Sequence, residues 1–268
     1  MKIALAQIRS LPGEVGQNVQ TILHNIHAAA DSGSDLVVFP EMSDTGYDMP
    51  TIMKTASVWE GGVYAEIAGV AAERKIAVIV GLSERVGEDI YNSVAVIGPD
   101  GKQIAKYRKI HLITTEPICE QNYLKPGEEF VLCKIQDFTV GLMTCYDIRF
   151  PEMARRLALS GADLLVVPAA WPMVRLEHWK TILACRAIEN QVYVAAVNRV
   201  GQDNSLQFCG ASRLLDPYGI TLGSASEIDE TLFTGEVSKA RIADIRDRLK
   251  IYQDRREDLY SKPDRDKT

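Results

Sequence analysis

The sequence predicts an α/β fold built from two stacked β-sheets with helices on their outer faces. Aliphatic runs alternate with helical patterns along the whole chain. The strand-like runs are almost continuous in Val, Ile and Leu, so each sheet needs cover on both of its faces. One sheet packed on a second, with helices outside, supplies that cover. A single doubly wound sheet is the alternative, but no G-x-G-x-x-G motif follows the first strand, which disfavours a dinucleotide-binding fold.

The first half of the chain alternates strands and helices. Apolar runs typical of buried strands occupy residues 2–8, 35–41 and 76–82. Apolar side chains spaced three or four residues apart predict helices over residues 17–31 and 62–75. Residues 93–107 predict a hairpin, because the segment PDG between its two apolar runs is rich in turn-forming residues.

The second half repeats this plan. The segment GADLLVVP (161–168) echoes GSDLVVFP (33–40), and VYVAAVN (192–198) echoes the strand at 76–82. The segment DPYG (216–219) echoes the turn of the first hairpin. The pattern therefore predicts a helix-strand-helix-strand-hairpin unit in each half. Two such units favour two sheets of similar design.

The length and composition predict one domain over residues 1–268. The chain is 46% hydrophobic, so it can bury a large core, and no Pro/Gly/Ser-rich linker divides it. Residues 239–268 form a highly charged C-terminal arm with sparse apolar residues. This arm is either solvated or packs on a partner subunit, and the sequence leaves both alternatives open.

Charge and cysteine content narrow the function classes. The net charge of −6 argues against a nucleic-acid partner. No apolar stretch reaches the roughly 20 residues of a membrane span, and the N-terminal apolar run is too short for a signal peptide. Five cysteines occur without any C-x-x-C pair, which disfavours a zinc knuckle or a thioredoxin-like site. We expect a reduced, cytoplasmic protein.

Cys145 stands where a strand is followed by a helix. Residues 138–144 (FTVGLMT) predict a strand, and Pro151 with Glu152 suits the first turn of a helix. Active sites of open α/β sheets lie at this kind of position, and amide dipoles there favour a thiolate. Free cysteine is also one of the most often buried residue types, so burial in the core is the alternative.

Two more chemically suitable residues stand at strand ends. Glu41 directly follows VVFP, where burial raises a carboxyl pKa towards useful values, and Lys109 follows the second strand of the first hairpin. A thiolate attacking a carbonyl or nitrile carbon needs a base and a cation of this kind. A Cys–His pair is the other solution, but of the four histidines only His111 is near a strand end.

Three segments resemble, in order and spacing, the signature blocks of the nitrilase superfamily of carbon–nitrogen hydrolases. They are FPE (39–41), YRKIHL (107–112) and GLMTCYDIRFPE (141–152). The resemblance implies a nitrilase-like α-β-β-α sandwich that pairs as a homodimer or higher oligomer, often through the C-terminal arm. It implies no metal and no organic cofactor.

The resemblance also implies a role for each matching residue. Glu41 corresponds to the general base, Lys109 to the cationic stabiliser and Cys145 to the nucleophile. EQNYLKPG (120–127) resembles the segment of a second family glutamate, so Glu120 would hold Lys109 and the substrate in place. The oxyanion would be met by Lys109 and by the backbone N–H of Tyr146.

The segment 171–203 resembles ω-amidases, which hydrolyse the side-chain amide of 2-oxo acids such as 2-oxoglutaramate. Trp171 could line the pocket, Arg175 could pair with a substrate carboxylate, and Tyr47 could line the entrance. Arg149 and Glu152 are expected to form structural salt bridges.

Several other functions stay open. Within the superfamily, the alternatives are an amidase for N-carbamoyl amines or deaminated glutathione, and a nitrilase. From other classes, a redox-sensing thiol protein and a non-catalytic binding relative remain, although none of the motif residues is missing.

Overall fold

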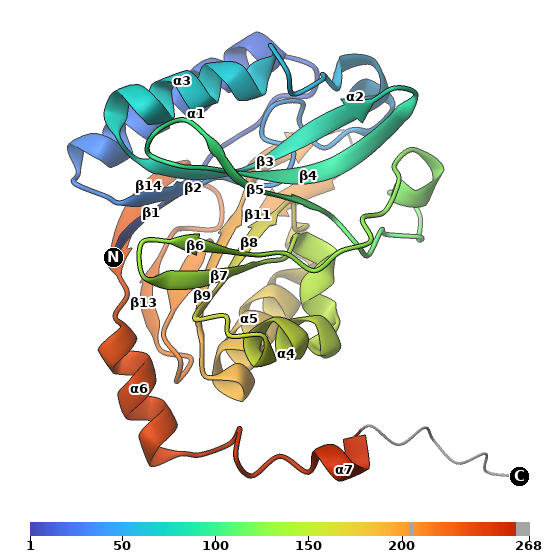
Figure 1. Ribbon diagram of the computed structural model, residues 1–268. Coiled ribbons are helices and arrows are strands. Elements are labelled where there is room, and N and C mark those ends of the chain that lie inside the picture. Colours follow the sequence, from blue (N-terminus) through green and yellow to red (C-terminus); the bar gives the residue numbers. More distant parts are fainter. Residues whose placement is uncertain (204–205, 261–268) are drawn as a thin grey trace, which may run out of the picture.

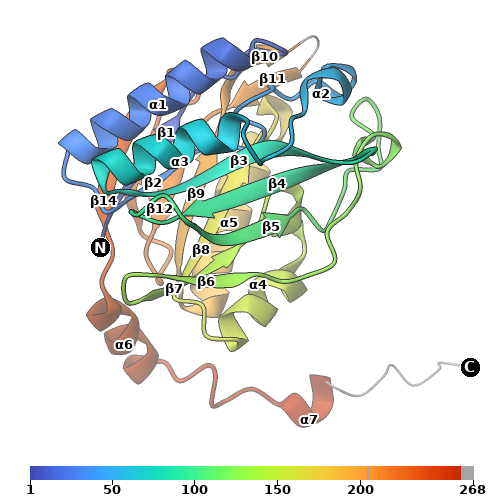
Figure 2. The same cartoon turned by 45° about the horizontal axis from the view of Figure 1, so that its top comes forward.

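The computed structural model describes residues 1–203 and 206–260, and these form two stacked six-stranded sheets with helices outside (Figures 1 and 2). The predicted α-β-β-α sandwich is confirmed. In strand order, the first sheet is β14-β1-β2-β3-β4-β5 and the second is β13-β12-β9-β8-β7-β6.

The first sheet has a parallel centre and antiparallel flanks. Strands β1, β2 and β3 run parallel, whereas β4, β5 and β14 join by antiparallel pairing. Its strands are β1 (Lys2–Gln7), β2 (Leu36–Val38), β3 (Ala77–Val86), β4 (Asp89–Ile97), β5 (Gln103–Arg108) and β14 (Thr231–Glu236). Its helices are α1 (Val15–Asp31), α2 (Met49–Thr55) and α3 (Val63–Arg74). Helices α1 and α3 cover its outer face (Figure 1).

The second sheet has the same design. Strands β7, β8 and β9 run parallel, and its members are β6 (Leu132–Ile135), β7 (Phe138–Leu142), β8 (Leu164–Ala169), β9 (Tyr193–Asn198), β12 (Arg213–Leu215) and β13 (Thr221–Ser224). A separate ribbon pairs β10 (Val200–Asp203) with β11 (Leu206–Cys209). The outer helices are α4 (Pro151–Leu159) and α5 (Leu176–Asn190). Three short 3₁₀ helices are η1 (Glu120–Asn122), η2 (Cys145–Arg149) and η3 (Met173–Arg175).

The core follows from the two-residue period of the strands. In β1, Ile3 and Leu5 face the second sheet, whereas Ala4 and Ala6 face the outer helices. Both sets are fully buried. Each central strand therefore needs apolar residues on both faces, which explains the continuous aliphatic runs of the sequence.

One strand contradicts the prediction that each half builds its own sheet. Strand β14 comes from the second half of the chain but pairs with β1 in the first sheet, with Lys2 opposite Glu236. Without β14, β1 would be an edge strand with unpaired backbone groups. The pairing of β14 with β1 covers that edge and links the two halves of the chain.

The C-terminal arm begins with α6 (Lys239–Arg248), which is anchored rather than fully solvated, because Ile242 and Ile245 are buried. The arm then extends away to α7 (Glu257–Tyr260) (Figure 1). Its last residues, 261–268, lie outside the described residues.

The strand directions bring several loops to one end of the sandwich. Strand β5 runs antiparallel to β4, which runs antiparallel to β3, so β5 ends at the same edge as β2 and β3. The segments after β2, β5, β7 and β8 therefore start from the carboxyl ends of their strands, where α/β folds place their sites.

Gly81 in β3 gives a test of how tightly the segment after β2 is held. A Cβ at Gly81 would lie 2.5 Å from the Pro40 oxygen and 2.6 Å from the Glu41 Cα. We expect Gly81→Ala to lower the free energy of unfolding by about 2 kcal/mol, because backbone must move to make room. Chemical denaturation measures this change.

The matched control is Gly69→Ala in α3, where nothing lies within 4 Å of the added Cβ. This change should stabilise the protein by about 0.5–1 kcal/mol, since alanine favours a helix interior. Equal effects of the two substitutions would contradict the close packing at Gly81.

Candidate active site

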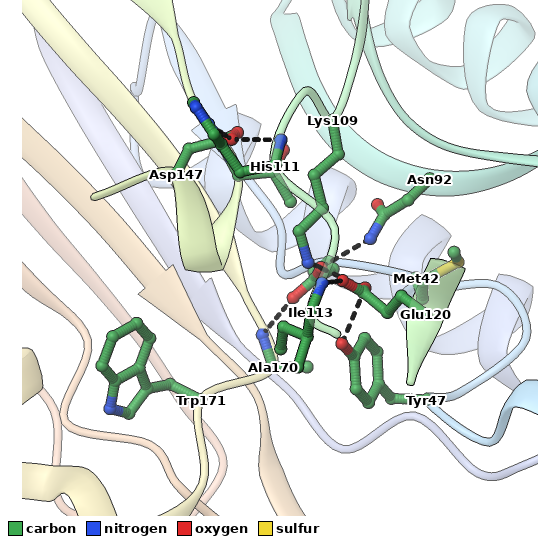
Figure 3. Close-up of polar contacts among 12 residues, drawn as sticks. Met42, Tyr47, Asn92, Lys109, His111, Ile113, Glu120, Asp147, Ala170 and Trp171 are labelled. Atoms are coloured by element: carbon green, nitrogen blue, oxygen red, sulfur yellow. Dashed lines mark hydrogen bonds and ion pairs between the residues drawn. The ribbon is translucent and has the colours of Figure 1, made fainter. Parts of the chain in front are cut away.

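A buried lysine between two glutamates forms the centre of the site. The Lys109 Nζ donates to Glu41 Oε1 at 2.9 Å and to Glu120 Oε1 at 2.8 Å, and all three side chains are fully buried. Figure 3 shows Lys109, Glu120, Tyr47 and Asn92 pointing towards one another. The site therefore holds one cation and two carboxyl groups away from water.

Lys109 and Glu120 are each held by hydrogen bonds to neighbouring segments. Lys109 follows β5, and its N–H donates to the Asn92 carbonyl while its own carbonyl accepts from Gly127 N, both at 2.8 Å. Glu120 opens η1, where its Oε2 accepts from the Ile113 N–H at 2.8 Å. The lysine and the second glutamate are thus fixed by both main-chain and side-chain contacts.

Cys145 is the first residue of η2, so the helical turn starts earlier than Pro151, where the sequence predicted it. Its φ of 46° lies in the left-handed region, which costs a non-glycine residue about 1–2 kcal/mol. The side chain is buried, and it lies close enough to Glu41 for each of the two groups to shift the pKa of the other. The structure therefore brings Cys145, Glu41 and Lys109, which follow predicted strands, together with Glu120, which only the resemblance indicated.

Asp147 connects the cysteine turn to the lysine segment. Its Oδ2 accepts from the Thr144 N–H at 2.8 Å and from the Tyr107 hydroxyl at 2.6 Å. Its Oδ1 accepts from the His111 N–H at 3.0 Å and contacts the His111 ring nitrogen Nδ1 at 2.8 Å (Figure 3). His111 is therefore a support for the loop and not a base beside the thiol.

Burial and neighbouring charges shift the pKa of each central group. Burial raises the pKa of Glu41; Lys109 opposes this shift and Glu120 adds to it. Burial and the Glu41 charge raise the pKa of the Cys145 thiol well above its ordinary value, against the effect of Lys109. Burial lowers the pKa of Lys109, but Glu120 and Glu41 outweigh it and hold that pKa well above its usual range. Near neutral pH, Cys145 is a thiol and Lys109 an ammonium.

Two contacts to Glu41 were not predicted. The Asn92 Nδ2 donates to Glu41 Oε1 at 2.5 Å, and the Ala170 N–H donates to Glu41 Oε2 at 2.7 Å. The alternation of side chains along the strand could have indicated Asn92. It lies two residues before Val94 and four before Val96, so it shares their face, which points to the other sheet. The Ala170 contact is a backbone contact, which residue types do not reveal.

Tyr47 lies deeper than the entrance position predicted for it. It is buried, and its hydroxyl donates to Glu120 Oε1 at 2.8 Å. Its ring meets Phe208 edge to face at 6.0 Å. Tyr47 therefore supports the second glutamate.

Trp171 and Arg175 follow β8, with Arg175 in η3. Trp171 is buried, and its Nε1 donates to the Arg175 carbonyl at 2.8 Å. Tyr146 follows the cysteine, half-buried, with its ring edge to face against Phe150. Its N–H lies in the first turn of η2, where backbone donors lack an intrahelical acceptor.

Arg149 does not form the salt bridge predicted for it. Its guanidinium stacks over the Trp171 ring at 4.5 Å, and burial and the charge of Arg175 lower its pKa. Among the ion pairs of the described residues, neither Arg149 nor Arg175 has a carboxylate partner, and Glu152 has no cationic one. Two neighbouring cations without an acid between them suit an anionic ligand.

Within residues 1–203 and 206–260, no three or more His, Cys, Asp and Glu side chains are grouped so that they could hold a metal ion. None of the described helices has the length and apolar character needed to cross a membrane.

Comparison with known proteins gives the same family as the sequence motifs. The model of the carbon–nitrogen hydrolase family matches residues 2–247. The 2-oxoglutaramate amidase of Bacillus subtilis is 33% identical over 85% of this chain and 87% of its own length. A protein named nitrilase from Pyrococcus abyssi is 35% identical over 97% of this chain and 99% of its own length.

A solved structure shows similar architecture. An amidase variant from Nesterenkonia sp. AN1 carries the acetamide moiety of fluoroacetamide on its active-site cysteine. It superposes with a TM-score of 0.86 at 27% identity, covering 97% of this chain and 95% of that one.

Removing the central cation tests the electrostatics of the site. We expect Lys109→Met to lower the free energy of unfolding by about 3–5 kcal/mol, because two buried carboxyl groups lose their counter-ion. Adding Glu120→Gln to that variant should restore part of the loss, and chemical denaturation of both proteins measures it.

The matched control is Lys102→Met, because Lys102 pairs with Asp100 at the exposed surface. This substitution should leave the free energy of unfolding nearly unchanged. A Lys109→Met protein as stable as this control would contradict the buried ion network.

Proposed function

Because this chain belongs to the carbon–nitrogen hydrolase family, with the family model matched over residues 2–247, we propose that Cys145 is the nucleophile with which it hydrolyses an amide. The chain is an amide-hydrolysing enzyme of the nitrilase superfamily. The observation that carries the proposal is the meeting of Cys145, Glu41 and Lys109 in one buried site.

The first half-reaction acylates the cysteine. Glu41 takes the thiol proton as the sulfur attacks the amide carbon, because the raised pKa of Cys145 keeps the free thiol protonated. The carbonyl oxygen becomes an oxyanion, which the Lys109 ammonium and the Tyr146 N–H stabilise. Glu41 then gives its proton to the departing nitrogen, so that ammonia leaves and a thioester remains.

The second half-reaction releases the acid. Glu41 takes a proton from water as the water oxygen attacks the thioester carbon, and the same donors again stabilise the oxyanion. The carbon–sulfur bond breaks, the proton returns to Cys145 and a carboxylic acid is formed. Glu120 stays beside Lys109 throughout and keeps the ammonium in place.

The most suitable substrate is an ω-amide of a 2-oxo acid, such as 2-oxoglutaramate. The guanidinium groups of Arg149 and Arg175 supply donors for a carboxylate, and the Trp171 ring supports the guanidinium of Arg149. The similarity to a protein named 2-oxoglutaramate amidase supports this substrate. The rival substrates are N-carbamoyl amines, deaminated glutathione and nitriles. Nitriles are included because one relative is named nitrilase.

A redox-sensing role fits the site less well. Sensor cysteines are solvent-accessible and have low thiol pKa values. Cys145 is buried and its pKa is raised.

The proposed assembly is a homodimer or higher oligomer in the cytoplasm. Apolar side chains are exposed on α5 and along the C-terminal arm, including Ile188, Leu249 and Leu259. A partner subunit would cover them. All five cysteines are free, which supports a reducing compartment.

Ammonia release from a panel of compounds tests the function. The panel contains 2-oxoglutaramate, deaminated glutathione, an N-carbamoyl amine and a nitrile of similar size. We expect the highest kcat/KM for 2-oxoglutaramate, none for any compound with Cys145→Ala, and a thioester on Cys145 in quenched reactions analysed by mass spectrometry. Turnover of the nitrile alone would refute the amide assignment.

Replacing the two cations tests the carboxylate site. The test compound is succinamate, which carries both an amide and a carboxylate. Arg149→Met and Arg175→Met should each lower its kcat/KM by about 10–100-fold, because each removes charge-assisted hydrogen bonds. Activity on butanamide, which has no carboxylate, should change less than about threefold.

Arg156→Met is the matched control, because Arg156 is an exposed arginine on α4, the helix that follows Arg149. It should leave both activities unchanged. Equal losses for succinamate and butanamide in the Arg149 and Arg175 variants would show that these residues do not bind the carboxylate.

A further inference from the structure

Asn92 in β4 contacts two residues of the proposed catalytic set. Its side-chain Nδ2 donates to Glu41 Oε1 at 2.5 Å, and its backbone carbonyl accepts from the Lys109 N–H at 2.8 Å. The residue is 1% exposed. Figure 3 shows its amide directed at the carboxylate cluster, from the side opposite Ala170. Asn92 therefore contacts both the base and the cation, but it has no assigned role.

The hydrogen bonds of Glu41 are unevenly divided between its two oxygens. Within the described residues, Oε1 accepts from Asn92 and Lys109, whereas Oε2 accepts from the Ala170 N–H. A carboxylate oxygen has two lone-pair positions. Those of Oε1 are both used, so the remaining capacity to receive a proton lies on Oε2.

Fold stability does not account for an asparagine at this position. The Asn92 Oδ1 is buried without a hydrogen-bond partner among the described residues. An unsatisfied buried acceptor is destabilising by about 1–3 kcal/mol. Val94 and Val96, at the same strand parity, fill the space between the sheets with apolar atoms. The contact that the amide does make is the one to Glu41.

We propose that Asn92 is a positioning residue that, together with Lys109, occupies Oε1 of Glu41, so that Oε2 is the oxygen that exchanges the proton with Cys145. This inference rests on the proposed role of Glu41 as the base, but it does not depend on which amide is the substrate.

The effect of removing Asn92 on the base has a definite sign. A hydrogen bond to a carboxylate favours its charged form, so its loss raises the pKa of Glu41 further. The titratable and charged groups that face Glu41 are Lys109, Glu120, Cys145, Tyr47, Tyr107 and Arg199. All of them remain in an Asn92 variant. A base with a higher pKa loses its proton at higher pH, so the acidic limb of the rate profile moves upward.

The test uses alkylation of Cys145 by iodoacetamide between pH 5 and 9, followed by mass spectrometry of the peptide that contains Cys145. This readout needs no knowledge of the substrate. Asn92→Leu keeps the approximate size of the side chain and removes the donor. We expect its acidic limb to lie about one pH unit above that of the parent protein. Asn92→Asp places a second carboxyl against Glu41 and should move the limb further, because two adjacent carboxylates resist joint ionisation.

Asn190→Leu is the matched control. Asn190 is also buried with an unpartnered Oδ1, but its Nδ2 bonds to the Arg186 carbonyl at the end of α5, away from Glu41. It should leave the acidic limb unchanged. If the role of Asn92 is purely structural, Asn92→Leu will lower the melting temperature without moving the acidic limb.

The results distinguish a failure of the inference about Asn92 from a failure of the proposed role of Glu41. An Asn92→Leu limb that coincides with the parent limb overturns the inference and leaves the role of Glu41 standing. A parent profile without an acidic limb overturns the role of Glu41, and the inference with it. If Asn92→Leu does not fold, Asn92→Ala decides by the same comparison, because it also removes the donor and adds no charge.

Discussion

The ion contact between Lys109 and two glutamates is the constraint on which the rest of the structure depends. Charges away from water are costly unless they are paired and hydrogen-bonded. One ammonium between Glu41 and Glu120 supplies the pairing, and Tyr47, Asn92 and two backbone amides complete the hydrogen bonds. Burial raises the pKa of Glu41 and the charge of Glu120 adds to this effect, whereas Lys109 opposes it. A carboxyl group with a raised pKa is better suited to accept and return a proton.

Much of the surrounding fold serves to hold these groups in place. Gly81 lets the segment that carries Glu41 lie directly against β3. Asp147 joins the cysteine turn to the lysine segment, so that the nucleophile and the cation cannot move independently. Because the parallel strands of both sheets end at the same side, a few short contacts suffice to assemble a site from distant parts of the chain.

The site also contains features that stability alone would not favour. Cys145 has a left-handed backbone conformation, and the Asn92 Oδ1 is buried without a partner. Strain and unsatisfied polar groups of this kind concentrate at functional sites, where the surrounding structure holds them. The large apolar core between the sheets provides that support.

Local patterns were enough to predict the central strands and two of the outer helices. The helices expected over 17–31 and 62–75 are α1 (Val15–Asp31) and α3 (Val63–Arg74), and the aliphatic runs became the central strands, because periodicity reports which side chains are buried. The positions of Glu41, Lys109 and Cys145 were likewise predicted, since each residue closely follows a predicted strand.

Only the tertiary structure decided which groups meet across the chain. The pairing of β14 with β1, the hydroxyl of Tyr47 on Glu120, the amide of Asn92 on Glu41 and the stacking of Arg149 on Trp171 all join residues that no local pattern relates. A one-dimensional pattern specifies burial and direction. The partner of a buried polar group depends on distances that exist only when both sheets are packed.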